Sequence, residues 1–255
     1  MSGDVSGFLA AYGALVALQR SAIVAAILWG LWIGLGRTMS APEARQATWL
    51  TVAGVLITWL VAVWLLAGVG AFEPGMPIPL LPPAIVLPLI IGFVALRSAD
   101  RIRAAIDAVP SSWLVGLQVY RVFGGVFVVF WALGALPGAW ALPAGLGDLA
   151  VGILALPAAV AVASGTQSGR AVGVAWNLLG IADVVSAVTL GALTAPGPLQ
   201  LQALAPDHSN LVVGAYPIAL TPAFVVPLSL ILHGLSLRRL RRQAARDGLR
   251  LAAAG

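Results

Sequence analysis

The chain has 255 residues, of which 60% are hydrophobic and only 9% are charged, and its formal net charge is +5. Soluble globular domains carry about 25% charged residues, so this composition excludes a soluble protein and predicts an integral membrane protein. Apolar runs of about 20 residues, the length of a membrane-spanning helix, recur along nearly the whole sequence. The polar intervals between them are too short to fold separately, which leaves no room for a soluble catalytic domain.

The residue types that the chain lacks exclude several chemistries. All 14 basic residues are Arg, and without Lys the chain cannot form a Schiff base, which excludes a covalently held retinal. Without Cys it has no disulfides, thiolate metal sites or cysteine nucleophiles. The use of Arg to the exclusion of Lys is typical of GC-rich bacterial genomes, so we expect a multi-pass protein of the bacterial cytoplasmic membrane.

Hydropathy predicts an all-α bundle of seven membrane-spanning helices. The third predicted span contains Pro82, Pro83 and Pro88, which are tolerated only if neighbouring groups satisfy the backbone atoms that they leave free. The predicted spans are residues 8–36, 47–71, 77–96, 112–136, 139–163, 171–195 and 211–236.

The distribution of Arg between the loops predicts the orientation, because basic residues concentrate in cytoplasmic loops. The opposite set of loops contains Asp4, Glu73 and Asp207 and no Arg. We therefore expect the N-terminus outside and the C-terminus in the cytoplasm, with residues 1–237 as the transmembrane domain and residues 238–255 as an Arg-rich cytoplasmic tail. The segments after the first, third, fifth and seventh spans contain 12 of the 14 Arg residues, namely Arg37, Arg45, Arg97, Arg101, Arg103, Arg170, Arg238, Arg239, Arg241, Arg242, Arg246 and Arg250.

Two polar segments are expected on the cytoplasmic surface. The segment SADRIRAAIDAVP, residues 98–110, places Asp100, Arg103 and Asp107 at helical spacing. The tail can attract anionic lipids at about 1 kcal/mol per Arg near the surface, although we favour a topology determinant without a specific ligand. A small-molecule ligand stays open as a partner besides the bilayer, a nucleic-acid partner is not expected, and the sequence does not determine the oligomeric state.

Four charged residues lie within the predicted spans: Arg20, Arg121, Asp148 and Asp183, whose charges sum to zero. At 1.5 Å per residue, Arg121 and Asp148 lie about 14 Å deep and Asp183 about 18 Å deep, in a hydrocarbon core about 30 Å thick. Charges at such depths face the bundle interior and find partners there. We predict that Arg121 pairs with one of the two carboxylates and that Arg20 serves the other.

Small and polar residues accompany these charges. The motifs GLGDL at 145–149 and GIADV at 180–184 are alike, and a short loop joins the fifth and sixth spans, so we expect an antiparallel hairpin that presents both carboxylates inward. The helix face of Asp148 permits close approach of another helix, because it carries Ala141, Ala144, Gly145, Gly152 and Ala155. The candidate residues of a ligand site or a proton pathway are Arg20, Gln118, Tyr120, Arg121, Asp148, Trp176, Asn177 and Asp183.

Four stretches of the C-terminal half carry a resemblance to a known group of proteins. They read LVGLQVYR in the fourth span, LPAGLGD in the fifth, WNLLGIAD in the sixth and TPAFVVPLSLILHGLSL in the seventh. In these stretches the chain resembles uncharacterised bacterial seven-span membrane proteins. The resemblance implies a common fold and no known activity.

Three uses of the intramembrane charges stay open. The first is a buried network that only fixes helix pairing. The second, which we favour among the functional uses, is transport of a small solute or proton, with an Asp as the titrating group and Arg121 as anion contact or counter-ion. The third is binding of a lipid, a pigment or a small apolar molecule in a cavity, with possible walls formed by Trp113, Trp131, Trp140 and Trp176.

An enzyme is the least supported class. Asp207 and His208 are adjacent in an outer loop, and His233, near the cytoplasmic end of the seventh span, is expected to be a hydrogen-bonded residue of a helix end. Histidines on opposite sides of a membrane cannot share a metal, and the dispersed glycines do not form a phosphate-binding loop. We therefore expect neither a metal site nor a cofactor.

Overall fold

The computed structural model describes residues 3–98, 100–206 and 210–254, and within these ranges the chain is all-helical, without a strand. Two short 3₁₀ turns, η2 and η3, lie in the connection after α8, whereas the 3₁₀ segment η1 and the π-helical η4 lie within long helical segments. In chain order the elements are α1 (Gly3–Thr38), α2 (Pro42–Gly68), α3 (Leu81–Ser98), α4 (Asp100–Ala108), α5 (Ser111–Gly116), η1 (Leu117–Gly125), α6 (Val126–Ala132), α7 (Gly138–Ala163), α8 (Gln167–Thr194), η2 (Gln202–Leu204), η3 (Val212–Gly214), η4 (Thr221–Val225) and α9 (Val226–Ala254).

Seven helical segments of the described chain are long and apolar enough to cross a membrane, so this is a multi-pass membrane protein. The prediction of seven spans in an all-α bundle is confirmed. The fourth span is a succession of α5, η1 and α6, and the seventh consists of η4 and the first part of α9. The third span, α3, is helical although Pro88 lies inside it.

The predicted start of the seventh span at residue 211 is wrong. Residues 211–220 form a loop that contains η3, and the span begins at Thr221. Pro217 and Pro222 lack the backbone N–H that a continuous helix requires. Residues 218–220 of this apolar loop are fully buried, whereas Leu211 and Tyr216 are exposed, so burial in the bundle accounts for the apolar composition of its second half.

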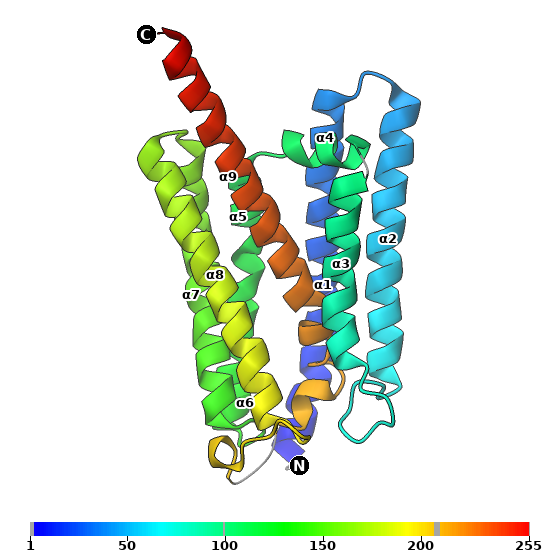
Figure 1. Ribbon diagram of the computed structural model, residues 1–255. Helices are drawn as coiled ribbons and strands as arrows, with labels where there is room; N and C mark the ends of the chain where they lie inside the picture. The colour runs from blue at the N-terminus through cyan, green and yellow to red at the C-terminus, as the bar shows by residue number, and fades with distance from the viewer. Residues whose placement is uncertain (1–2, 99, 207–209, 255) are drawn as a thin grey trace.

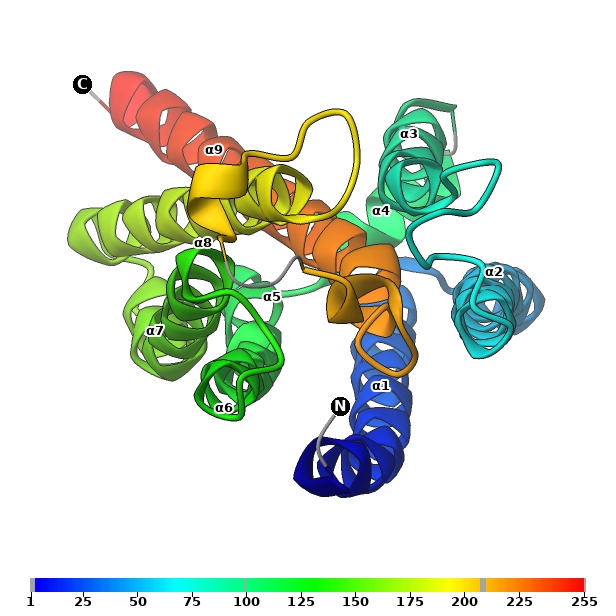
Figure 2. The same ribbon diagram turned by 90° about the horizontal axis from the view of Figure 1, so that it is seen from below.

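The helices form two groups that face each other across α9 (Figures 1 and 2). One group contains α5, η1, α6, α7 and α8, and the other contains α1, α2, α3 and the short α4. α9 crosses between the groups and is the most buried of the seven spans, whereas α3 buries no residue. This arrangement brings η1, α7, α8 and α9 together in the middle of the bundle.

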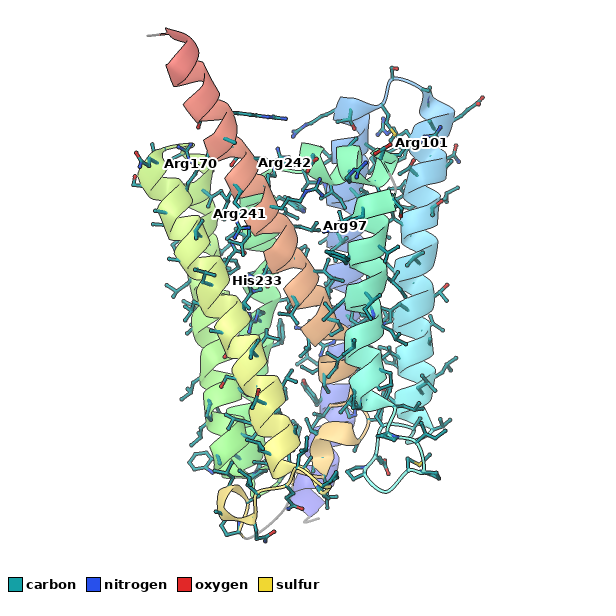
Figure 3. All side chains as sticks on the ribbon, in the orientation of Figure 1. Arg97, Arg101, Arg170, His233, Arg241 and Arg242 are labelled. Atoms are coloured by element: carbon teal, nitrogen blue, oxygen red, sulfur yellow. The ribbon has the colours of Figure 1, made fainter. Side chains whose placement is uncertain are left out.

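The Arg residues of the loops gather at one end of the bundle. Arg97, Arg101, Arg170, Arg241 and Arg242 lie at or toward the end where the chain terminates (Figure 3), and the N-terminus lies at the opposite end (Figure 1). The alternation of basic and Arg-free loops therefore corresponds to two ends of the molecule. The assignment of the basic end to the cytoplasm stays a prediction.

The Arg-rich tail continues α9 without a break, so the expected boundary between residues 237 and 238 lies inside a helix. α4 lies across the basic end (Figure 1), where its Asp107 forms ion pairs with Arg238 and Arg242 of α9. Arg170 of α8 pairs with Asp247 of α9 at 2.6 Å. These contacts anchor the first turns of the tail to α4 and α8.

Candidate functional site

Arg121 lies on η1, which is wound as a 3₁₀ helix for nine residues. Such runs rarely exceed three or four residues and often mark a functional hinge when they interrupt a longer helix. With three residues per turn, Gln118, Arg121 and Gly124 align on one face. That face points into the bundle, because Gln118 is fully buried and Arg121 is 4% exposed.

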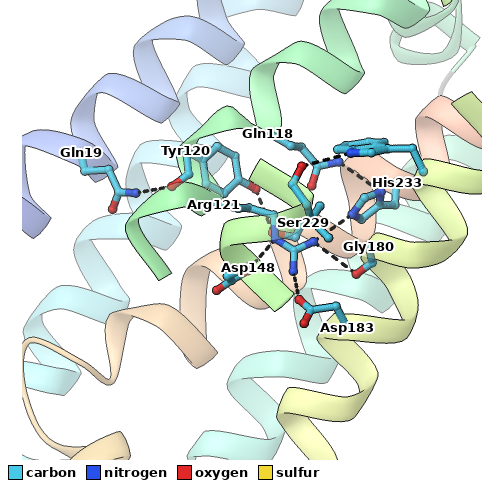
Figure 4. A network of polar contacts seen from close by, with 11 residues as sticks. Gln19, Gln118, Tyr120, Arg121, Asp148, Gly180, Asp183, Ser229 and His233 are labelled. Carbon is cyan, nitrogen blue, oxygen red and sulfur yellow. Dashed lines mark hydrogen bonds and ion pairs between the residues drawn. The ribbon is translucent and has the colours of Figure 1, made fainter. Parts of the chain in front are cut away.

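Arg121 forms ion pairs with both carboxylates of the α7–α8 hairpin. Its Nε donates to Asp148 Oδ1 at 2.7 Å, and its Nη2 donates to Asp183 Oδ2 (Figure 4). The predicted pairing of Arg121 is thus confirmed, and so is the inward presentation of both carboxylates. One guanidinium and two ionised carboxylates give this triad a net charge of −1.

Glycines make the space for the triad and its neighbours. A Cβ at Gly124 would coincide with the Asp148 carboxylate, and one at Gly147 with the carboxylate of Asp183. Gly180 lies in the same way against the imidazole of His233, and its carbonyl accepts from Arg121 Nη1 at 3.2 Å. The small-residue face predicted around Asp148 is also confirmed, because Gly152 packs against the η1 backbone.

His233 belongs to the same cluster, and its prediction as a helix-end residue is wrong. It is fully buried on α9, which continues to Ala254. Its Nε2 lies 3.2 Å from Arg121 Nη1, and its Nδ1 lies 2.9 Å from Asn177 Oδ1. Because the guanidinium can only donate, Nε2 must accept, so the ring is neutral and donates from Nδ1 to Asn177. The spacing of Ser229, His233 and Ser236 on one helix face was the signal for this position.

Asn177 and Trp176 hold the imidazole in place. The Asn177 amide donates to Gly173 O at 2.7 Å and to Ser236 Oγ at 3.0 Å, which orients its oxygen toward His233. The Trp176 ring packs on the imidazole with a centroid distance of 5.1 Å, and its indole N–H donates to a carbonyl of α7. Both residues therefore position His233.

Gln118 is the least satisfied member of the cluster. Its Nε2 lies 3.3 Å from His233 Nδ1, but both atoms are donors in the tautomer derived above. Within the described residues its Oε1 is buried without a hydrogen-bond partner. An amide orientation with Oε1 toward Nδ1 would remove this conflict, and the Nδ1–H would then be shared between Asn177 and Gln118.

Tyr120 connects η1 to two other helices. Its hydroxyl lies 2.8 Å from Ser229 Oγ on α9, and its backbone carbonyl accepts from Gln19 Nε2 of α1 at 3.0 Å (Figure 4). Tyr120 is buried. It therefore extends the polar contacts from the α7–α8 side of the bundle to α1.

The prediction that Arg20 serves one of the two carboxylates is wrong. Arg20 donates to Gln19 Oε1 and, at 2.8 Å, to Thr221 Oγ1 at the start of η4, and the ion pairs of the described chain do not include it. The reason is tertiary, because the α7–α8 hairpin packs against η1 and brings both carboxylates to Arg121. Arg20 is nevertheless 2% exposed.

Polar side chains follow α9 through most of the membrane. Thr221 contacts Arg20, Ser229 contacts Tyr120, His233 contacts Arg121, and Ser236 contacts Asn177. From Thr221 to Ser236 the helix rises about 22 Å at 1.5 Å per residue. This is about three-quarters of the thickness of the hydrocarbon core.

A separate cavity of about 170 Å³ lies on the other side of α9, with walls from α1, α2, α4, α5 and α9. Leu228, Leu232 and Leu235 of α9 face it, and its lining is almost entirely apolar. Trp113 is one wall, but the other Trp residues considered as walls are elsewhere. Trp131 is largely exposed, Trp140 donates to the Ala187 carbonyl at 2.8 Å, and Trp176 packs on His233.

The part of the chain that the structure describes contains no group of three or more His, Asp or Glu residues able to hold a metal ion. Asp207 and His208 lie outside the described residues. Within the bundle the cluster consists of the guanidinium, the two carboxylates, the imidazole and their amide and hydroxyl neighbours.

The comparisons with known proteins identify a family. Residues 78–241, more than half of the chain, match a family described as a domain of unknown function, DUF8737. The chain belongs to this family. The part that matches the DUF8737 family contains Arg121, Asp148, Asp183 and His233, whereas Arg20 lies outside it. No curated protein and no solved structure matched the chain.

Proposed function

We propose that this protein is a proton-coupled transporter of a small solute in the bacterial cytoplasmic membrane, with the C-terminus in the cytoplasm. Asp148 and Asp183 are the proton-binding groups, and Arg121 is their fixed counter-ion. The observation that supports this proposal most directly is the pair of carboxylates on one buried guanidinium, within three membrane spans.

The net negative charge of the triad favours the binding of a proton. A guanidinium stays protonated in proteins, so Arg121 contributes a constant charge of +1. With both carboxylates ionised the triad has a net charge of −1, and one bound proton makes it neutral. Charges in the membrane interior are costly and are typical of proton relays, so two states that differ by one proton are the basis for coupling.

The partial exposure of the carboxylates also supports the proposal. The side chains of Asp148 and Asp183 are 20% and 11% exposed, whereas that of Arg121 is 3% exposed. The carboxylates are thus accessible to a probe of the size of water, while the counter-ion is enclosed. The polar side chains along α9 offer hydrogen-bonding groups on both sides of the triad.

The test is proton flux in vesicles that contain the purified protein and an internal pH-sensitive dye. We expect Asp148→Asn and Asp183→Asn each to abolish flux after an imposed pH step. Both variants should fold, because the remaining carboxylate still pairs with Arg121 and the triad becomes neutral. Asp100→Asn is the matched control, since Asp100 is an exposed residue of α4 whose partner is Arg103. Wild-type flux in both triad variants would refute the proposal.

Ligand binding without transport is a second candidate, and the apolar cavity beside α9 favours it. Its volume of about 170 Å³ is close to that of an engineered cavity of about 150 Å³ that binds benzene or xenon. Mass spectrometry of the protein purified in mild detergent tests this candidate. A stoichiometric apolar molecule that is lost when Val52 of the cavity wall is replaced by Phe would favour it.

A further inference from the structure

We infer that the bundle contains a binding site for a small zwitterion, whose carboxylate faces Arg20 and whose ammonium group faces Asp148. This inference rests on the proposed transport function, because it names the class of the transported solute. The interior charges are distributed unevenly. The triad around Arg121 has a net charge of −1, and Arg20 is a cation whose hydrogen-bond partners are neutral.

Arg20 has the surroundings of an anion site. Its guanidinium donates to the Gln19 side-chain oxygen and to the Thr221 hydroxyl, and the Tyr12 hydroxyl lies close to Thr221 and Arg20. Within the described residues its Nε is buried and has no hydrogen-bond partner. A buried cation without a hydrogen-bonded carboxylate is costly, and a ligand carboxylate would supply both the missing charge and the missing acceptor.

Asp148 is partly exposed on a buried face of α7. Its neighbours on the same face of α7, one turn before and one turn after, are Ala144, Gly145, Val151 and Gly152, and all four are buried. The Asp148 side chain is nevertheless 20% exposed, so a probe of the size of water reaches it.

Arg20 and Asp148 are the two poles of the proposed site, and they lie within electrostatic range of each other. Asp148 interacts electrostatically with Arg20 and with Tyr12. Arg121 is unsuited to binding the solute, because each of its three nitrogens already contacts a protein group. Of these two interior guanidinium groups, that of Arg20 has a nitrogen, Nε, without a protein partner among the described residues, and Asp148 is the more exposed carboxylate of the triad.

A zwitterion matches this charge pattern and adds no net charge to the membrane interior. The backbone near both poles also departs from α-helical geometry. Arg20 contacts the first residue of η4, a π-helical turn of five residues, and Asp148 contacts the 3₁₀ segment η1. π turns and 3₁₀ segments inside longer helices are frequent at functional sites and hinges.

The inference is tested by binding to the full chain in mild detergent, followed by calorimetry and thermal unfolding. The probes are alanine, which is a zwitterion, propionate, which has only the carboxylate, and ethylamine, which has only the ammonium group. We expect saturable binding and a higher unfolding temperature with alanine alone. Equal binding of propionate, or no binding of alanine, would overturn the zwitterion site.

Variants identify the two poles. Arg20→Gln and Asp148→Asn should each weaken alanine binding by at least about tenfold, because each removes a charge-assisted contact. Arg170→Gln, at the basic end of the bundle, is the control and should bind alanine normally. If Arg20→Gln does not fold, Thr221→Val removes one hydroxyl of the same pole and should weaken alanine binding several-fold. Unchanged binding in Thr221→Val and Asp148→Asn contradicts the inference.

The outcome for alanine binding can be distinguished from the outcome for proton flux. Asp183→Asn removes a proton-binding group without touching either pole of the zwitterion site. If that variant loses proton flux while alanine does not bind to the wild type, the zwitterion site is wrong and proton coupling stands. If alanine binds and both triad variants keep wild-type proton flux, the coupling is wrong and the binding site stands.

Discussion

The packing of α7 and α8 against η1 differs sharply from the packing of α2 and α3 on the other side of α9. α7 has a buried face that is rich in small residues. Gly124 of η1, Gly147 of α7 and Gly180 of α8 each make room for a side chain of the triad or for His233. In contrast, α3 buries no residue, and Gly54 and Gly68 of α2 have open space where a Cβ would lie.

The difference reflects how helices associate in a lipid bilayer. Lipid tails are as apolar as Leu, so hydrophobic burial does not drive one span against another, and close packing of small residues and polar contacts must do so. These features are concentrated where η1, α7, α8 and α9 meet. α2 and α3 display large apolar side chains such as Leu50, Leu65 and Phe93 at their surfaces, as expected of helices that face lipid.

The largest effect is expected from Arg121→Gln, which leaves two carboxylates in the interior without their cation. Removing one partner of a buried ion pair costs about 3–5 kcal/mol, and the like charges of Asp148 and Asp183 add to this. We expect a large loss of thermal stability in detergent. The triple variant Arg121→Gln, Asp148→Asn, Asp183→Asn removes all three charges and should regain most of it. No recovery in the triple variant would show that the charges do not hold these helices together.

A smaller but more selective loss of stability is expected when single methyl groups are added at glycines beside the triad. Gly147→Ala places a Cβ on the Asp183 carboxylate and Gly180→Ala places one on the His233 ring, and overpacking of this kind costs about 1–3 kcal/mol. Gly54→Ala on α2 is the matched control, because nothing lies within 4 Å of its Cβ position. It should be neutral or slightly stabilising, since Ala favours a helix more than Gly does. Equal unfolding temperatures for Gly147→Ala and Gly54→Ala would contradict the contrast between the two regions.

The smallest effect is expected in the apolar cavity. Val52→Leu adds one methylene at the cavity wall, which contributes at most about 0.8 kcal/mol when it is buried. A small rise in the unfolding temperature is therefore expected, whereas a comparable addition beside the triad destabilises. A fall as large as that of Gly147→Ala would mean that this side of α9 is packed as tightly as the other.

Much of the candidate site could be predicted from residue types and depth. The four charged residues stand out because ionisable groups are rare in membrane spans, and the helical rise places Arg121 and Asp148 at equal depth. Both of these residues, and Asp183, do meet in the structure. His233 was missed because hydropathy placed it near the end of a span, although its helix continues for more than five turns beyond it.

The sequence by itself determined the class of the protein, the number of its spans, and the separation of its Arg residues from its acidic loops. These properties are local, because each span must have a minimum apolar length and satisfy its own backbone hydrogen bonds. Only the tertiary structure decided that one Arg takes both carboxylates, that Arg20 faces hydroxyls and an amide, and that His233 joins the triad. The rotation of each helix and the choice of its neighbours decide these contacts, and apolar side chains suit lipid and protein interior equally well.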